Sequence, residues 1–208
     1  MEEIIFSSVT AQVEREKLWT IPELLLGRGK LTVINGISGS GKTVLCNILS
    51  GFSKGYAGKI TINGVELREL DPRWYHKRMG YAMQRTMIFS DTVQGNVAMG
   101  RNVEQSWKEE LFSVCGMDEI FGKLGEVELH GDSNILSGGE RQRIGFARAL
   151  YSDPDVVILD DVFTALDGRR RKSLCQYLKD KKRDHIIVVV NSYPEVLNLA
   201  DQVVTLSV

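Results

Sequence analysis

The amino-acid sequence predicts an α/β fold with a mixed-sheet core, a small antiparallel part near the N-terminus and a helical subdomain. Three observations lead to this prediction: apolar runs that alternate with helix-like stretches, one hairpin signal, and one long stretch with few strand signals. Continuous runs of β-branched residues separated by helices are typical of strands buried in a parallel sheet. The expected strands are 31–35, 59–62, 79–83, 156–160, 186–190 and 203–206.

Helix-like stretches separate many of these strands, as an α/β fold requires. They cover residues 43–50, 140–151 and 169–182. Residues 56–66 have a different pattern, because their apolar residues alternate and an Asn-Gly pair interrupts them. This combination indicates an antiparallel hairpin.

The chain of 208 residues has the length of one large domain. Between residues 92 and 125 the pattern is helical and strand signals are few. We therefore expect a single domain over residues 1–208, with a helical subdomain inside it over roughly residues 86–145.

The composition is that of a folded protein close to electrical neutrality. Hydrophobic residues make up 43% and charged residues 25%, which excludes disordered and collagen-like classes. The 26 basic and 27 acidic residues give a net charge of −1, so we expect no nucleic-acid partner. The longest apolar run, at 186–190, is far shorter than the roughly 20 residues of a membrane span. The cysteines Cys46, Cys115 and Cys175 form no CxxC pair and are expected to be free thiols.

The segment GISGSGKT matches the phosphate-binding pattern GxxxxGK[ST] in full. It lies between a predicted strand and a predicted helix, which is the context that the pattern requires. Glycines allow backbone N–H groups to face a phosphate chain, and the helix N-terminus favours negative charge. An ordinary glycine-rich turn is the alternative. The residues expected to bind the phosphates are Gly36, Ser38, Gly39, Ser40, Gly41, Lys42 and Thr43.

Two further groups would complete this site. The Lys42 ammonium would reach the β- and γ-phosphates, and the Thr43 hydroxyl would bind Mg²⁺. The strand VVILD ends in Asp160, whose carboxylate would join the Mg²⁺ shell directly or through water. A carboxylate at a strand end is often only a helix cap. Together with the phosphate-binding loop, however, Asp160 indicates a Mg²⁺ ligand.

A third motif, LSGGE at residues 136–140, precedes RQRIGFARALYSDPDVVILDD. With these motifs in this order, the chain resembles the ATP-binding domain of ABC transporters over nearly its whole length. The segment MIFSDTVQGNVAMG, which follows Gln84, resembles the exporter type of this family. The resemblance implies a P-loop NTPase fold of the ABC type.

The resemblance also implies roles for individual residues. Gln84 would contact Mg²⁺ and the attacking water and would face a membrane partner. Ser137, Gly138 and Gly139 would bind the γ-phosphate of an ATP held by a second protomer, so that two domains enclose two ATP molecules head to tail. Asp167 would cross the seam of that dimer. A glycine-rich helix N-terminus suits an anion, although Ser137 and the glutamate after the glycines also fit a simple capping box.

Two catalytic positions differ from the family pattern. Asp161 stands where the family usually has glutamate as general base, and its shorter side chain would hold the carboxylate about 1.5 Å back. Such a misplacement slows hydrolysis by about 10²-fold, unless Asp161 recruits the water differently. Ser192 falls on the position of the switch histidine, counted back from Ala200 and Asp201. Serine supplies no imidazole to the γ-phosphate.

A third difference concerns the aromatic residue that stacks on adenine in this family. It usually precedes the phosphate-binding loop by about 25 residues, where this chain has Ala11. Trp19 is one aromatic residue close to that position, and either stacks on adenine or belongs to the core of an N-terminal strand.

The function that the resemblance implies is ATP binding and hydrolysis, with Mg²⁺, in a domain that powers a membrane transporter. The expected partners are a transmembrane domain or subunit and a second ABC ATPase protomer, identical or different. We expect a cytoplasmic location at the inner face of a membrane. The alternatives are a low-turnover regulatory half of an asymmetric transporter, which Asp161 and Ser192 favour, and a soluble ABC ATPase outside transport.

Overall fold

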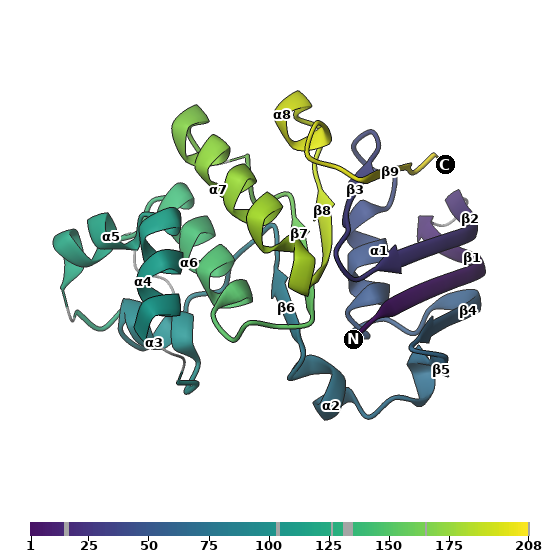
Figure 1. Ribbon diagram of the computed structural model, residues 1–208, viewed down its shortest axis with the longest axis horizontal. Coiled ribbons are helices and arrows are strands. Elements are labelled where there is room, and N and C mark those ends of the chain that lie inside the picture. Colours follow the sequence, from purple (N-terminus) through teal and green to yellow (C-terminus); the bar gives the residue numbers. More distant parts are fainter. Residues whose placement is uncertain (15–16, 103–104, 126, 131–134, 165, 208) are drawn as a thin grey trace.

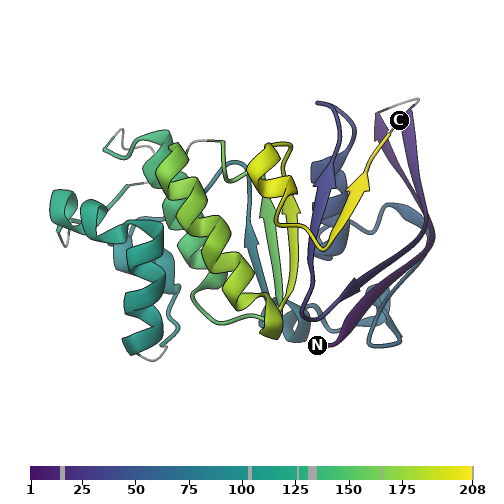
Figure 2. The ribbon, with the colours of Figure 1, turned by 45° about the horizontal axis from the view of Figure 1, so that its top comes forward.

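The computed structural model describes residues 1–14, 17–102, 105–125, 127–130, 135–164 and 166–207. Three parts follow one another along the long axis in Figure 1: a group of helices, a parallel sheet and an antiparallel sheet. The same order is seen in Figure 2. The α/β class and the antiparallel N-terminal part agree with the sequence prediction.

Among the described residues, the antiparallel sheet has four strands in the order β2-β1-β4-β5. Its last two strands form the predicted hairpin, and its turn residues Asn63 and Gly64 have φ values of 49° and 84°. Positive φ at both positions matches the right-handed twist of the strands. The strands are β1 (Glu3–Glu14), β2 (Lys17–Gly27), β4 (Tyr56–Ile62) and β5 (Val65–Glu66).

The second sheet has the order β6-β7-β8-β3-β9, and every strand pairing that the structure describes in it is parallel. It differs in this from the expected mixed sheet, because the antiparallel strands form a sheet of their own. The physical reason is burial: helices cover both faces of a parallel sheet, whereas a hairpin pairs with its sequence neighbour. The strands are β3 (Leu31–Asn35), β6 (Met79–Ala82), β7 (Val156–Asp160), β8 (Ile186–Val190) and β9 (Gln202–Thr205).

The parallel sheet separates two hydrophobic cores. Along β7, Val157 and Leu159 face the core built with the helices α6 and α7, whereas Val156 and Ile158 face the core shared with α1 and the antiparallel sheet. This alternation is the two-residue period of a strand, with both faces buried. The α1 helix therefore lies between the two sheets (Figures 1 and 2).

Most of the α-helices pack in the core that Val157 and Leu159 face. Those at the far end from the antiparallel sheet are α3, α4 and α5 (Figure 1). They lie within the predicted 86–145 segment, but α6 continues past it and packs on β6, so this division of the chain stays a prediction. The helices are α1 (Lys42–Leu49), α2 (Pro72–His76), α3 (Val93–Ala98), α4 (Gln105–Cys115), α5 (Met117–Leu124), α6 (Gly138–Leu150), α7 (Gly168–Lys181) and α8 (Pro194–Leu197).

Two further sequence expectations concern single features. The three cysteines are free and buried. In the part of the chain that the structure describes, no helix combines the length and apolar character of a membrane span.

Substituting Gly80 by alanine is expected to destabilise the fold by about 3 kcal/mol, at the upper end of overpacking effects. A Cβ atom at Gly80 would lie 1.7 Å from the Ala149 carbonyl oxygen, so β6 and α6 would have to separate. Gly122→Ala in α5 is the matched control, because its Cβ meets nothing within 4 Å and alanine favours helices by about 1 kcal/mol. Urea unfolding followed by circular dichroism measures both, and an unchanged midpoint for Gly80→Ala would contradict the packing.

Candidate functional site

A cavity of about 560 Å³ opens where β3, β7 and β8 end. The loop after β3, the carboxylates at the end of β7 and the residues after β8 all contribute to its lining. Ligands of open parallel sheets bind beyond the carboxyl ends of the strands, and this cavity has that position.

The loop between β3 and α1 is shaped for an anion. Gly39 and Gly41 have φ values of 78° and 84°, which favour glycine. Gly41 precedes α1 and has no side chain to cap it, so the first N–H groups of the helix are available to a phosphate. The hydroxyl of Ser40 is buried and has no hydrogen-bond partner. An orphaned buried donor in such a loop points to a missing acceptor.

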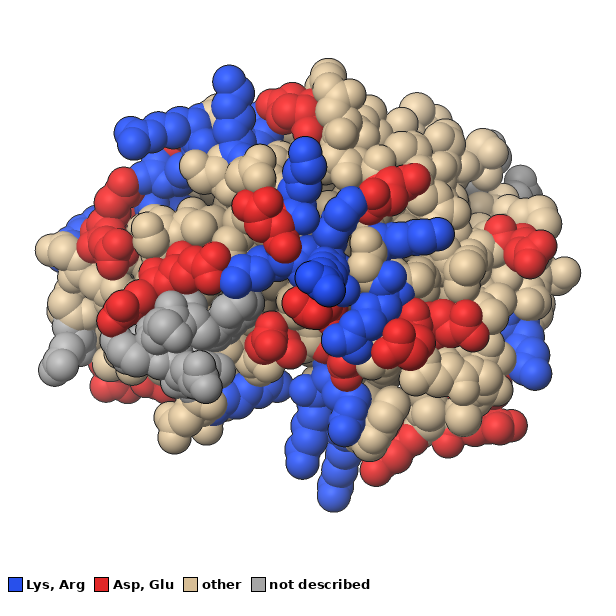
Figure 3. Space-filling model, viewed as in Figure 1, with Lys and Arg blue, Asp and Glu red and all other residues tan. Residues whose placement is uncertain are grey.

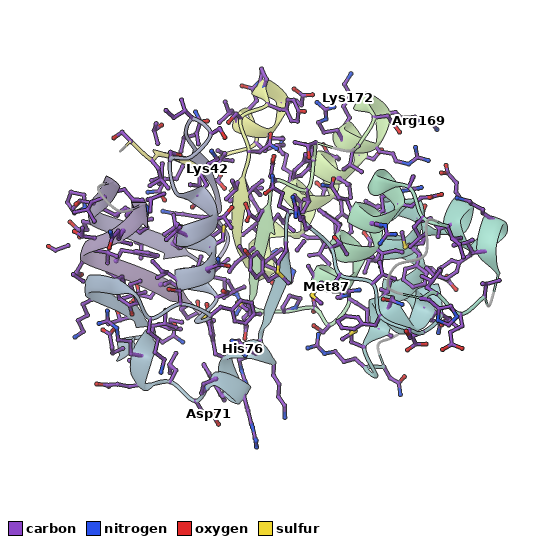
Figure 4. All side chains as sticks on the ribbon, turned by 180° about the vertical axis from the view of Figure 1, so that it is seen from behind. Lys42, Asp71, His76, Met87, Arg169 and Lys172 are labelled. Carbon is purple, nitrogen blue, oxygen red and sulfur yellow. The ribbon has the colours of Figure 1, made fainter. Side chains whose placement is uncertain are left out.

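Lys42 supplies the positive charge of this loop and stands at its junction with α1 (Figure 4). Its ammonium group donates hydrogen bonds to the carbonyl oxygens of Gly36 at 2.7 Å and Ile37 at 2.8 Å. The ammonium is therefore held across the loop, within the wall of the cavity. A polyphosphate offers it charged acceptors that are stronger than these carbonyls.

Asp160 is positioned as a ligand for a hard cation. It ends β7 with 2% of its surface exposed, and Thr43 lines the same cavity beside it. The Tyr81 hydroxyl lies 3.5 Å from the Asp160 Oδ2 atom. Burial raises the pKa of Asp160, with Thr43 opposing and the neighbouring Asp161 adding to the rise. A hydroxyl and a carboxylate that line one cavity fit Mg²⁺, which prefers oxygen ligands and takes others from phosphate and water.

Asp161 lies beside it at the edge of the cavity, with a φ of 54°. Its Oδ2 atom accepts a hydrogen bond of 3.4 Å from the Gln84 amide. Burial raises the pKa of Asp161, while Lys42 and Gln84 act in the opposite direction. A carboxylate of raised pKa that faces a polar cavity is suited to accept a proton.

Asn191 and Ser192, the two residues after β8, both line the cavity, but only Asn191 has a hydrogen bond to Asp161. Ser192 is exposed, and its hydroxyl donates to the Asn35 side chain at 2.9 Å. Asn191 is the residue that points to the carboxylate: it is 2% exposed, and its Nδ2 atom donates to Asp161 Oδ1 at 3.4 Å. The Tyr193 N–H donates to Asn191 Oδ1 at 2.8 Å, which sets the orientation of the amide. The sequence prediction placed the switch position at Ser192 and did not include Asn191, although Asn191 is the first residue after the strand IIVVV.

These features agree with the comparison to known proteins. The profile of the family described as "ABC transporter" matches residues 22–164. The chain belongs to this family. Its members bind ATP, and this chain is an ATP-binding subunit or domain of the kind that energises ABC transporters.

The relatives include an import ATP-binding protein and a member of the ABC transporter B family. A probable sulfate/thiosulfate import ATP-binding protein of Chlorella vulgaris is 34% identical over 88% of this chain and 78% of its own length. The chloroplastic ABC transporter B family member 26 of Arabidopsis thaliana is 31% identical over 86% of this chain and 26% of its own length. The chain therefore spans from about a quarter to about three quarters of these relatives.

The ABC fold itself is shown by a solved structure. A bacterial Atm1-family ABC exporter with ATP bound has a TM-score of 0.87 at 21% identity. The match covers 99% of this chain and 37% of the exporter chain.

The ABC signature loop lies apart from the cavity. Ser137 caps α6, and it forms a capping box with Glu140 through hydrogen bonds of 2.6 and 3.2 Å. Ser137 and Gly138 are exposed, Gly139 is half-buried, and none of the three lines the cavity. The capping box is therefore present, and Gly138 stays exposed beside it.

Trp19 belongs to the core and does not reach the nucleotide cavity. It is 1% exposed, pairs with Ala11 across β1 and β2, and packs below Gly41. A ring that is buried in this way has no free face for adenine. Of the two expectations for Trp19, adenine stacking is therefore wrong, and the residue belongs to the core. The reason is the strand alternation, which turns Trp19 toward the inner face of the antiparallel sheet.

Proposed function

We propose that this chain binds MgATP, pairs head to tail with a second ABC ATPase protomer and hydrolyses ATP to drive a transmembrane partner of the exporter type. One observation carries the proposal: a single cavity at the strand ends is lined by Lys42, Thr43 and Asp160, together with Gln84 in contact with Asp161. Each group has a distinct task in phosphoryl transfer.

The cavity residues have separate roles in ATP binding and hydrolysis. The loop from Gly36 to Gly41 binds the phosphates through its N–H groups, and Lys42 neutralises their charge. Thr43 and Asp160 would hold Mg²⁺, which would supply positive charge to the triphosphate. Gln84 orients the attacking water, and Asp161 accepts its proton as the oxygen bonds to the γ-phosphorus. The bond between the γ-phosphorus and the β-phosphate oxygen breaks, which leaves ADP and phosphate.

The second protomer supplies the signature loop. Ser137 and Gly138 are exposed at the N-terminus of the 13-residue helix α6, which is a favourable position for an anion from another molecule. Because Ser137, Gly138 and Gly139 stand outside the cavity of their own chain, a complete site takes these residues from a partner.

The transmembrane partner contacts the segment around Gln84. Met83, Met87 and Phe89 are exposed apolar side chains that flank it, with exposed fractions of 39%, 62% and 41%. Exposed apolar side chains in one segment are typical of protein–protein contacts. This assignment puts the chain at the inner, cytoplasmic face of a membrane, with a partner that completes the transporter.

Nucleic acid is not a partner in this proposal. Basic and acidic side chains are interspersed over the face in Figure 3. Within the basic run at the start of α7, Arg170 pairs with Asp167 and Glu119, and Arg171 pairs with Glu195. Such pairing removes charge that phosphate recognition would need.

A second candidate is a low-turnover regulatory half of an asymmetric transporter, in which the chain holds ATP but hydrolyses it slowly. The observation that favours it is Asp161, a short carboxylate held back by two amides, from Gln84 and Asn191. Steady-state MgATP turnover at several protein concentrations, with ATP affinity measured alongside, tests both candidates. Turnover that rises faster than linearly supports the first, tight binding with negligible turnover supports the second, and absence of MgATP binding contradicts both.

Asn191→Ala is expected to lower kcat about tenfold and leave ATP affinity unchanged, because one hydrogen bond of about 1.4 kcal/mol to Asp161 is lost. Ser192→Ala, at the neighbouring cavity residue, is the matched control and should change kcat by no more than about twofold, since the Ser192 hydroxyl donates to Asn35 and not to Asp161. Turnover and equilibrium binding are measured for each variant. The opposite ranking, with Ser192 the more sensitive position, would contradict the assignment.

A further inference from the structure

The Asp160 carboxylate has a tyrosine as its neighbour on the adjacent strand β6. The strands β6 and β7 pair in parallel, with Tyr81 opposite Ile158 (Figure 1). Asp160 lies two residues further along β7 and therefore on the same face of the sheet as Ile158. This face is turned toward α1, because Tyr81 and Ile158 both pack in the core that α1 shares with the antiparallel sheet. The Tyr81 hydroxyl thereby reaches Asp160 at the end of β7.

Two acceptors lie around the Tyr81 hydroxyl. The Asp160 Oδ2 atom is 3.5 Å away, and the Asn47 Oδ1 atom is 3.4 Å away. Asn47 lies in α1 one helical turn after Thr43, so the hydroxyl connects β6 and β7 with the helix that follows the phosphate-binding loop. A tyrosine hydroxyl keeps its proton at neutral pH and has one to donate. The carboxylate is the charged acceptor of the two and therefore the stronger one.

The Tyr81 ring is held by packing and not only by its hydroxyl. Its centroid lies 6.0 Å from that of the Phe52 ring, in the segment that follows α1. The ring also packs against the buried core on this side of the sheet, and the pairing with Ile158 fixes the backbone. Replacing the tyrosine by phenylalanine therefore keeps the ring in place and removes only the hydrogen-bond donor.

A donor at one oxygen limits the rotation of a carboxylate. Side chains that bind a metal are usually oriented by such hydrogen bonds, and loss of the orienting group lowers metal affinity by about 10- to 100-fold. Asp160 lines the nucleotide cavity, whereas Tyr81 is not among the described residues that line it. Any effect of the Tyr81 hydroxyl on a bound ligand must therefore pass through Asp160.

We propose that Tyr81 is a positioning residue for Mg²⁺: its hydroxyl holds the Asp160 carboxylate in the orientation that binds the cation. This proposal rests on the proposed function and adds to it a residue that touches neither the nucleotide nor the cation. Binding of Mg²⁺ then depends on the Tyr81 hydroxyl, whereas binding of nucleotide without metal does not.

Tyr81→Phe in the full chain tests this role. The affinity for ATP is measured by equilibrium binding in EDTA and at increasing concentrations of free Mg²⁺. In EDTA the variant should match the unmodified chain within about twofold, because the phosphate-binding loop is unchanged. The free Mg²⁺ concentration that gives half of the full effect on ATP affinity should rise about tenfold, the lower end of such losses, since the contact is long.

Tyr75→Phe is the matched control, because it removes the same hydroxyl from the same core. The Tyr75 hydroxyl donates to the Leu49 carbonyl oxygen at 2.7 Å, and Tyr75 does not line the cavity. Its loss should lower the thermal stability and leave the Mg²⁺ dependence unchanged. A folded Tyr81→Phe variant with unchanged Mg²⁺ dependence, or an equal shift for Tyr75→Phe, would overturn the proposal and leave the proposed function intact. If Mg²⁺ had no effect on ATP binding by the unmodified chain, the Mg²⁺ site of the proposed function would itself be wrong.

Discussion

Asp161→Glu is expected to raise ATP turnover by about 10²-fold, the effect of moving a reacting group by about 1 Å. The longer side chain extends the carboxylate, which the Gln84 and Asn191 amides contact in the unmodified chain, further into the cavity. Steady-state turnover at saturating MgATP measures the gain. The affinity for MgATP should stay unchanged, because the phosphate-binding groups are untouched.

Two controls accompany the Asp161→Glu variant. Asp161→Asn keeps the shape but accepts no proton, so its turnover should fall while MgATP binding persists. Since Asp161 has a φ of 54°, which Asp tolerates better than Glu, thermal unfolding must show that the glutamate variant is folded. A folded Asp161→Glu variant with wild-type turnover would mean that the reach of the carboxylate does not limit hydrolysis. Unimpaired Asp161→Asn would mean that Asp161 is not the base.

Lys42→Ala is expected to weaken MgATP binding by roughly 10- to 100-fold, since hydrogen bonds to charged groups contribute about 1.5–3 kcal/mol. The ammonium crosses the loop through its contacts with Gly36 and Ile37, so the variant loses both the charge and the support of the loop. Isothermal titration calorimetry measures the affinity directly.

Lys54→Ala is the control for this substitution, because it removes the same charge from an exposed position. Its affinity for MgATP should match that of the unmodified chain. If the two lysine variants bound MgATP equally well, the cavity would not be the triphosphate site. Lys42→Arg separates the roles further: it keeps the charge but not the compact ammonium, and an intermediate affinity is expected.

Some of the site was predictable because its residues are contiguous. Gly36 to Thr43 form one loop and one helix start, so local spacing specifies which N–H groups converge. Asp160 was predictable for a related reason, because a buried strand that ends in a carboxylate presents it at the sheet edge. The turn at Asn63 and Gly64 was equally local, since its backbone conformation depends on those two residues.

Other parts depend on pairings that are distant in sequence. Whether Asn191 or Ser192 faces Asp161 is decided by the direction of the chain after β8, which the Tyr193 N–H sets through the Asn191 amide. The burial of Trp19 follows from its register opposite Ala11. Neither the register nor the loop direction leaves a pattern in the amino-acid order.

The sequence by itself determined the α/β class, the phosphate-binding loop and the order of the ABC motifs. These properties are local, because they depend on residue types at fixed spacings along one segment. Only the tertiary structure decided that the core sheet is parallel, that the Asn191 amide contacts Asp161 and that Val13 of β1 lines the cavity. These properties depend on segments far apart in sequence, which side-chain packing and strand register bring together.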